Sequence, residues 1–144
     1  MKLSIVDLEV AIRTKVVSLN LETPFTFDAD LKHNFSPLDI QGNLLRQESP
    51  FFEFTNDIVN SYRVGPSAVS PTRYLGDLYI TYYTKDPSTI KDVKLLESTA
   101  NEFSEKTIDG IRFRTFTPFQ KGMKDGFTAY SGVINFDFEL YRGS

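Results

Sequence analysis

Apolar and polar residues alternate strongly in two long segments of the chain, 73–83 and 130–141. Successive side chains of a β-strand point to opposite faces of a sheet, so this alternation predicts two strands. In the later segment the apolar face is formed by Ile134, Phe136, Phe138 and Leu140. In the earlier segment one face carries Tyr74, Gly76, Leu78, Ile80 and Tyr82, and the other carries Leu75, Asp77, Tyr79, Thr81 and Tyr83.

Two other segments repeat their apolar residues at the spacing of an α-helix. The first begins at Ser4, a favourable N-cap, and has Asp7 in its first turn. The second begins at 86–88, where Pro87 suits a first-turn position. The stripes predicted to be buried are Leu8, Ala11, Ile12, Val16 and Leu19 in the first helix, and Ile90, Val93, Leu96, Ala100 and Phe103 in the second.

The remaining segments predict shorter strands and loops. Short strands are expected at 25–27, at 51–55, around 62–64 and at 111–116. Loops are expected at 38–49, 65–72 and 118–126, where polar residues, glycine or proline gather. In the last short strand, Arg112, Arg114 and Phe116 should share one face, and Ile111 and Phe113 the other.

Two helices cannot cover both faces of a sheet of about four to six strands. The predicted fold is therefore α+β: a two-layer sandwich of a mixed, mostly antiparallel sheet with both helices on one face. The opposite face, which includes Tyr79 and Tyr83, is expected to be half-apolar and uncovered. The length of 144 residues fits a single domain spanning 1–142, with Gly143 and Ser144 interpreted as a cloning remnant.

The composition argues against an enzyme. The chain has no cysteine, which excludes disulfides and thiolate metal sites, and His33 is its only histidine. No nucleophile motif accompanies that histidine, so it is interpreted as a turn residue that bonds locally. No phosphate-binding glycine loop follows a predicted strand. We therefore predict no catalytic residue and no cofactor.

Asp28, Asp30 and His33 have the side-chain types that bind a divalent metal. The further oxygen ligands of a calcium-binding loop do not follow them, so we interpret the segment as a solvated loop and predict no metal site. No apolar run approaches the roughly 20 residues of a membrane span. The first residues also lack a signal-peptide cleavage site, which favours a cytosolic origin.

Arg112 and Arg114 alternate with aromatic rings, a pattern that single-strand nucleic-acid readers use. The formal net charge of −3 disfavours that function, because a nucleic-acid footprint should be basic. We expect these arginines to pair instead with acids of a neighbouring strand, Asp137 or Glu139. The aromatic content of 14% further suggests that a neighbouring molecule covers some rings, although scattered exposed rings would also account for it.

The pattern Arg-Tyr-x-Gly-x-Leu-x-Ile-x-Tyr at 73–82 resembles a strand of the minor tail proteins that terminate long non-contractile bacteriophage tails. The likeness continues through the helix at 90–105, the turn into 111–113 and the closing segment Tyr-Ser-Gly-Val-Ile-Asn-Phe at 130–136. It also includes the opening helix, and Asn-Phe-Ser-Pro at 34–37 looks like a shortened form of that family's Asn-x-x-Phe-x-Pro turn. The chain departs from the family by an insertion after Pro37 and by lacking an aromatic residue before the turn.

This resemblance to the tail-terminator family implies a structural virion protein, assembled in the host cytoplasm and located in the tail. Its expected form is a homo-oligomeric ring, a hexamer in that family, which caps the tail tube protein and stops tail polymerisation. The other side of the ring would join a head-completion protein, and DNA would only pass through the lumen. The interface candidates are Arg63, Arg73, Tyr79, Tyr83, Phe119, Lys121 and Lys124.

Two other functions stay open at this point, because a fold-level likeness does not fix function. One is another head–tail connector or tube component. The other is a single-stranded nucleic-acid-binding module that uses Arg112 and Arg114.

Overall fold

The computed structural model describes residues 5–27, 29–30, 36–37, 50–66, 70–124 and 126–140. The predictions for Ser4, Asp28, His33 and 38–49 lie outside these residues, as do Asn34 and Phe35 of the expected turn and the last four residues. The helices are α1 (Ile5–Ser18) and α2 (Thr89–Ala100), and the strands are β1 (Phe25–Thr26), β2 (Ala29–Asp30), β3 (Ser36–Pro37), β4 (Phe51–Arg63), β5 (Thr72–Thr84), β6 (Thr107–Ile108), β7 (Ile111–Phe113), β8 (Thr117–Lys124) and β9 (Phe127–Leu140).

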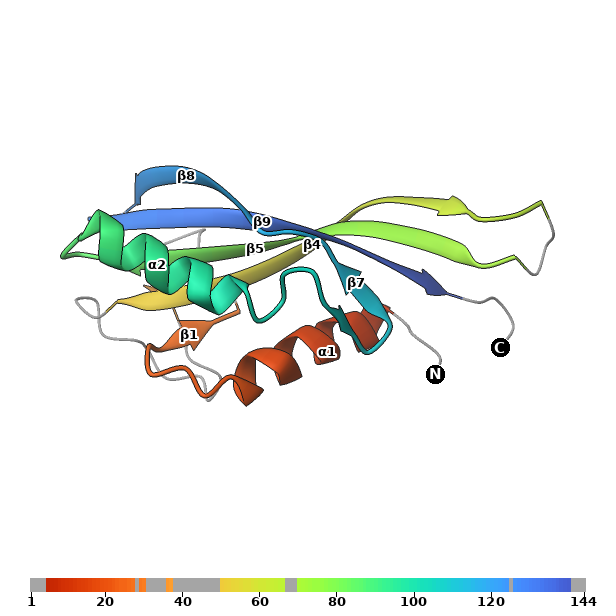
Figure 1. Cartoon of the computed structure of the whole chain (residues 1–144), viewed down its shortest axis with the longest axis horizontal. Coiled ribbons are helices and arrows are strands. Elements are labelled where there is room, and N and C mark those ends of the chain that lie inside the picture. Colours follow the sequence, from red (N-terminus) through yellow and green to blue (C-terminus); the bar gives the residue numbers. More distant parts are fainter. Residues whose placement is uncertain are drawn as a thin grey trace.

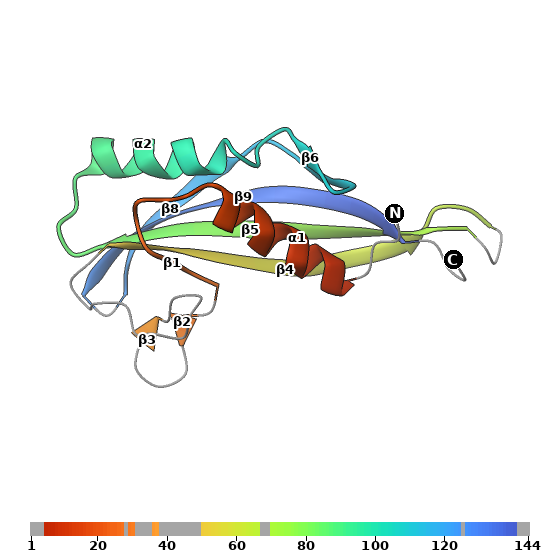
Figure 2. The ribbon, with the colours of Figure 1, turned by 90° about the horizontal axis from the view of Figure 1, so that it is seen from below.

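Seven of these strands form one sheet in the order β1–β4–β5–β9–β7–β6, with β8 also paired to β9. β1 is parallel to β4, and the other described pairs are antiparallel. β2 and β3 form a separate two-stranded pair. Figures 1 and 2 show that the main sheet curls into a half-barrel. The α+β class and the mostly antiparallel sheet are confirmed, but the predicted number of strands was too low, because very short strands extend the sheet at its edges.

Both helices pack on one face of the sheet, which we call the inner face (Figures 1 and 2). Leu8 and Ile12 of α1 and Leu96 of α2 share a single buried cluster with Phe54 of β4 and Ile134 of β9. Each large apolar side chain buried in this way stabilises the fold by about 1.5–3 kcal/mol. The helical stripe of α1 and the alternation of β5 and β9 are therefore interpreted correctly from the sequence.

Gly76 allows close packing at the centre of the sheet. It lies opposite Ile58 of β4 on one side and Phe136 of β9 on the other. A Cβ atom at this position would contact the Phe136 ring closely and would lie 2.5 Å from the backbone oxygen of Asp57. The absence of a side chain at Gly76 thus lets the Phe136 ring lie flat over the strand.

The buried stripe of α2 differs from the prediction at its first position. Ile90 is 74% exposed, whereas Asp92 is 4% exposed. The Asp92 carboxylate accepts a hydrogen bond from the Ser88 backbone N–H at 2.8 Å, so it satisfies a free donor at the helix N-terminus. Because that contact turns Asp92 inward, Ile90 points to solvent.

Two other predictions are corrected by the sheet. The segments 51–55 and 62–64 are the two ends of one strand, because the polar residues between them pair with β5 along its whole length. The segment 118–126, predicted as a loop, mostly belongs to β8, which pairs with β9 through a hairpin that turns at Gly126 (φ +83°). Backbone groups of a long strand such as β9 need partners on both sides, and this requirement outweighs the missing alternation in β8.

The strand predicted at 111–116 ends at Phe113. Arg112 does face away from the inner side, opposite Asp137, while Ile111 and Phe113 are buried. Phe116, beyond the end of the strand, instead packs against the inner core beside Gly132. The prediction that Phe116 shares a face with the arginines is therefore wrong.

Candidate functional site

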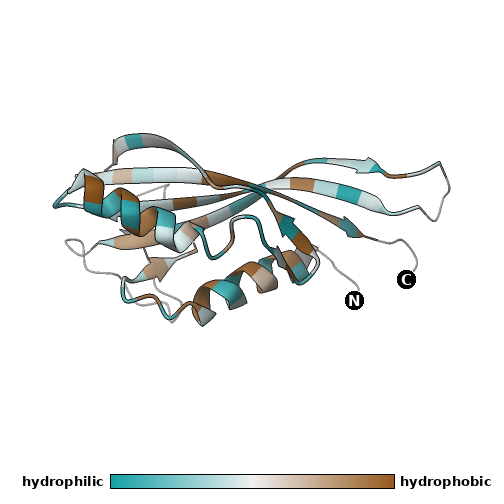
Figure 3. Cartoon of the chain, in the orientation of Figure 1, coloured by the Kyte–Doolittle hydropathy of each residue, from teal (hydrophilic) through white to brown (hydrophobic). Residues whose placement is uncertain are grey.

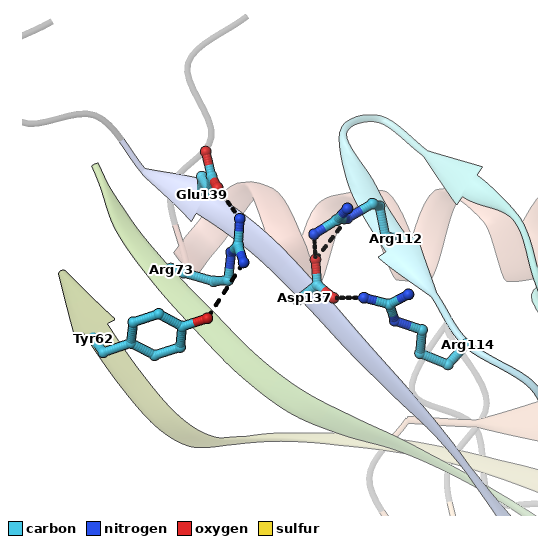
Figure 4. A network of polar contacts seen from close by, with 6 residues as sticks. All are labelled: Tyr62, Arg73, Arg112, Arg114, Asp137 and Glu139. Carbon is cyan, nitrogen blue, oxygen red and sulfur yellow. Dashed lines mark hydrogen bonds and ion pairs between the residues drawn. The ribbon is translucent and has the colours of Figure 1, made fainter. Parts of the chain in front are cut away.

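A polar network covers the outer face of the sheet where β4, β5, β9 and β7 lie side by side (Figure 4). Arg73 donates a hydrogen bond from Nη2 to Glu139 Oε1 at 2.5 Å and one from Nη1 to the Tyr62 hydroxyl at 3.3 Å. Register explains the contact, because Arg73 of β5 lies between Tyr62 of β4 and Glu139 of β9. The hydrogen bond to Glu139 raises the pKa of Arg73 above its ordinary value, and the bond to Tyr62 adds to this.

Asp137 is the buried centre of this network. Its Oδ1 accepts a hydrogen bond from Arg112 Nε at 2.7 Å, and its Oδ2 accepts one from Arg114 Nη2 at 2.7 Å. The Asp137 side chain is 5% exposed, whereas the side chains of Arg112 and Arg114 are 49% and 59% exposed. Burial alone would raise the pKa of Asp137, but the two guanidinium groups outweigh it and hold that pKa below its ordinary value. The expected pairing of both arginines with Asp137 is thus confirmed.

At the other end of the outer face, Phe51, Tyr83 and Phe127 form a second small cluster. The rings of Phe51 and Tyr83 stack with centroids 4.9 Å apart, and Phe127 meets Phe51 edge-on at 5.5 Å. The Tyr83 hydroxyl donates to Glu53 Oε1 at 3.3 Å. Burial raises the pKa of Tyr83 far above its ordinary value, and the Glu53 carboxylate raises it further.

The prediction of an uncovered outer face is wrong at Tyr83, while the cluster of Phe51, Tyr83 and Phe127 provides apolar residues on that face. Tyr83 is only 6% exposed, because its ring is buried within the chain itself, so it is not available to a partner. Tyr79 is half-buried, and its hydroxyl donates to Asp77 Oδ2 at 3.3 Å. Burial raises the pKa of Tyr79, with the Asp77 carboxylate contributing as well.

The other predicted interface residues fall in separate places. Arg63 is exposed at the end of β4, and Lys121 is exposed on β8. Arg73 is committed to the network with Glu139 and is half-buried. The side chains of Phe119 and Lys124 lie outside the described part of the structure, although both residues belong to β8.

The end of the β4–β5 hairpin projects beyond both helices, as Figures 1 and 2 show. We call residues 58–66 and 70–75, from the irregularity in β4 to the end of the hairpin, the arm; at its base Ile58 and Tyr74 still pack against the inner core, and its tip lies beyond the helices. Three of its apolar residues are exposed: Val59 by 59%, Tyr62 by 45% and Val64 by 43%. Figure 3 shows apolar and polar residues interspersed along the arm. The hairpin is closed by a hydrogen bond from Val64 N–H to Pro71 O at 2.9 Å. The sequence predicted 51–55 and 62–64 as separate short strands, so the projecting end of one long hairpin was not predicted.

A groove lies between α2 and the β8–β9 hairpin, with a volume of about 250 Å³. Its lining residues come from α2, β8 and β9: Thr89, Val93, Leu96, Pro118, Lys121, Tyr130 and Ser131. The Lys121 ammonium lies 5.7 Å from the centroid of the Tyr130 ring. The hydroxyls of Thr89 and Tyr130 are 3.4 Å apart. The groove is thus mostly apolar, with hydroxyl groups and one cation at its border.

The described part of the chain contains no cluster of three His, Asp or Glu side chains that could hold a metal ion. Its helices are too short to cross a membrane. No protein-family model matches the chain, and no curated protein matches it in sequence.

Proposed function

We propose that this chain is a structural subunit of a bacteriophage tail, which joins copies of itself into a ring that caps the tail tube. The ring ends tube polymerisation and presents its other side to the head. The order of helices and long strands, and the strand Arg-Tyr-x-Gly-x-Leu-x-Ile-x-Tyr, support this proposal through their likeness to tail terminators. The observation that carries it is the arm, with its three exposed apolar residues.

The arm is an unusual shape for a protein that acts alone. Apolar side chains exposed on the arm stabilise little while they face water, and covering Val59, Tyr62 and Val64 would contribute up to about 1.5–3 kcal/mol for each side chain. A neighbouring subunit offers such cover. If one patch binds a different patch on the next copy, closure gives a ring and avoids a filament.

The test is a tube-length assay. Tail tube protein is polymerised with and without the chain, and tube lengths and tube ends are measured by negative-stain microscopy, with native mass spectrometry for the free oligomer. We expect shorter tubes with a ring at one end. Val64→Lys on the arm should abolish capping, whereas Ile90→Lys, at a more exposed position on α2, should not. A chain that neither binds tubes nor changes their length would overturn the proposal.

Lys121 and Lys124 provide a second test on another element. Both belong to β8, and Lys121 is exposed. Replacing both by Glu should weaken ring or tube binding, because it reverses local charge complementarity. The thermal unfolding midpoint should stay close to that of the unchanged protein. Assembly at the unchanged level would count against a role for this edge.

The nearest alternative is another head–tail connector or tube component, which the arm would serve equally well. The same assay separates them, since a tube component would be incorporated along tubes and lengthen them. Nucleic-acid binding through Arg112 and Arg114 would instead appear as salt-sensitive binding in titrations at two ionic strengths. The pairing of both arginines with Asp137 leaves less free positive charge for that function.

A further inference from the structure

The size of the groove between α2 and β8 indicates what can fill it. Its volume of about 250 Å³ lies below the range of roughly 300–1,000 Å³ typical of small-molecule pockets. It suits one or two apolar side chains of another protein. Lys121 at its border forms no ion pair with any residue that the structure describes, so an occupant with a carboxylate beside its apolar group would complement the charge.

The arm and the strand leading into it offer these two groups together. Asp57 of β4 lies directly opposite Asp77 of β5, and like charges in facing positions of a sheet repel each other. Asp77 accepts hydrogen bonds from Tyr79 and Asn135, whereas Asp57 is exposed and forms no ion pair with a described residue. Two residues further on, Val59 occupies a bulge and is 59% exposed. This part of the strand thus presents an apolar side chain beside a carboxylate that would gain from a cation.

The tip of the arm lies far from α2 and β8 in both Figure 1 and Figure 2, and Asp57 and Val59 lie nearer the middle of β4, level with Gly76 and Asp77 of β5. We propose that the arm of one copy docks into the groove of the next, with Val59 between α2 and β8 and Asp57 paired with Lys121. The occupant is a second copy of this chain. Such a contact joins two different patches, so it propagates head to tail, and it forms a ring where the rotation between successive copies closes. This inference rests on the proposed ring and specifies its subunit contact.

Disulfide trapping tests the contact directly, because the chain has no cysteine of its own. Full-length Val59→Cys protein is mixed with isotope-labelled Val93→Cys protein under mild oxidation, and mixed dimers are counted by mass spectrometry. The matched control is Ile90→Cys, on the same helix and 74% exposed but outside the groove. Docking raises the effective concentration of the two thiols, so the mixed dimer with Val93→Cys should form at least about tenfold faster than that with Ile90→Cys. Equal rates would overturn the proposal.

A charge exchange provides an independent readout. Asp57→Lys and Lys121→Asp should each weaken self-association by about two- to fivefold, the range of an exposed ion pair, and the two changes in one chain should restore it. Failure of the double variant to recover would contradict the pairing, provided that circular dichroism shows it folded. A ring that caps tubes without trapping Val59 near Val93 would refute this contact and leave the proposed function standing. Trapping in a protein that never caps a tube would support the contact and refute the cap.

Discussion

Removal of both guanidinium groups from Asp137 should destabilise the fold by more than the sum of the two single changes. Asp137 is almost fully buried between Arg112 and Arg114, and each arginine alone can still neutralise it. In Arg112→Ala or Arg114→Ala the carboxylate keeps one charged donor. In the double variant Asp137 loses both arginine donors, and its buried charge is left without these two cations.

The structure sets the expected size of these effects. A hydrogen bond to a charged group contributes about 1.5–3 kcal/mol, and we reduce this to about 1 kcal/mol for each arginine because both side chains are about half exposed and screened by solvent. Leaving a buried charge without its partners costs about 3–5 kcal/mol. The double variant should therefore lose about 1–3 kcal/mol beyond the sum of the singles.

The pH dependence should also change sign. In the unchanged protein the folded pKa of Asp137 is lowered, so its contribution is full above the ordinary value of 3.8 and is lost as pH falls through the folded pKa. In the double variant burial should raise that pKa above the ordinary value. The folded state then binds a proton that the unfolded state lacks, and stability falls as pH rises from about 4 toward 7.

Urea unfolding of both proteins at several pH values between about 4 and 7 measures this pH dependence. Subtracting one unfolding free energy from the other removes the contribution of the carboxylates that titrate identically in the two proteins. The difference in unfolding free energy should grow with pH. Arg63→Ala combined with Lys91→Ala, which removes two exposed charges, should show a small difference that stays constant. If the Arg112 and Arg114 effects are additive and independent of pH, the argument from a buried carboxylate is wrong.

Three further predictions concern the packing of the sheet and the helix. Gly76→Ala should destabilise the fold by about 2–3 kcal/mol through overpacking, measured by urea unfolding, while Gly122→Ala, where a Cβ would meet nothing within 4 Å, should stay within about 1 kcal/mol of the unchanged protein. Leu96→Ala should cost about 2–5 kcal/mol, because Leu96 is 1% exposed, and Ile90→Ala should cost less than about 0.5 kcal/mol; a similar loss for both would contradict the placement of α2. In an alkaline absorbance titration, Tyr83→Phe should remove a tyrosine that ionises only when the fold opens, because burial raises its pKa; loss of an early-ionising tyrosine would refute its burial.

The periodic parts of this fold could be predicted from the sequence, because a covered face imposes a pattern on the chain. α1 and the inner faces of β5 and β9 have buried positions at the expected spacing, such as Ile12, Leu78 and Ile134. The pairing of Arg112 and Arg114 with Asp137 could also be predicted, since alternation alone places them on one face. These features depend on local sequence and on one neighbouring strand.

The rest depends on contacts that leave no periodic signal. β8 contains Pro118 and Gly122 and alternates poorly, and it is a strand because β9 continues far enough to pair with it. Asp92 is buried by a capping contact that outweighs its charge, and this changes the outward face of α2. The groove joins residues far apart in the chain, so only Lys121 among its lining residues was a candidate from the sequence.

The polarity of the outer face determines where copies of this chain can meet. Arg73, Asp77, Asp137 and Glu139 already make cross-strand contacts on the outer face, and covering these four side chains would desolvate them for little gain. The opposite face is occupied by α1 and α2. Assembly over this part of the outer face is therefore disfavoured, which leaves the arm, which exposes apolar residues, and the groove, which has room for one. A contact between the arm and the groove joins each copy to two neighbours with a fixed rotation at each joint, and a ring forms where that rotation closes.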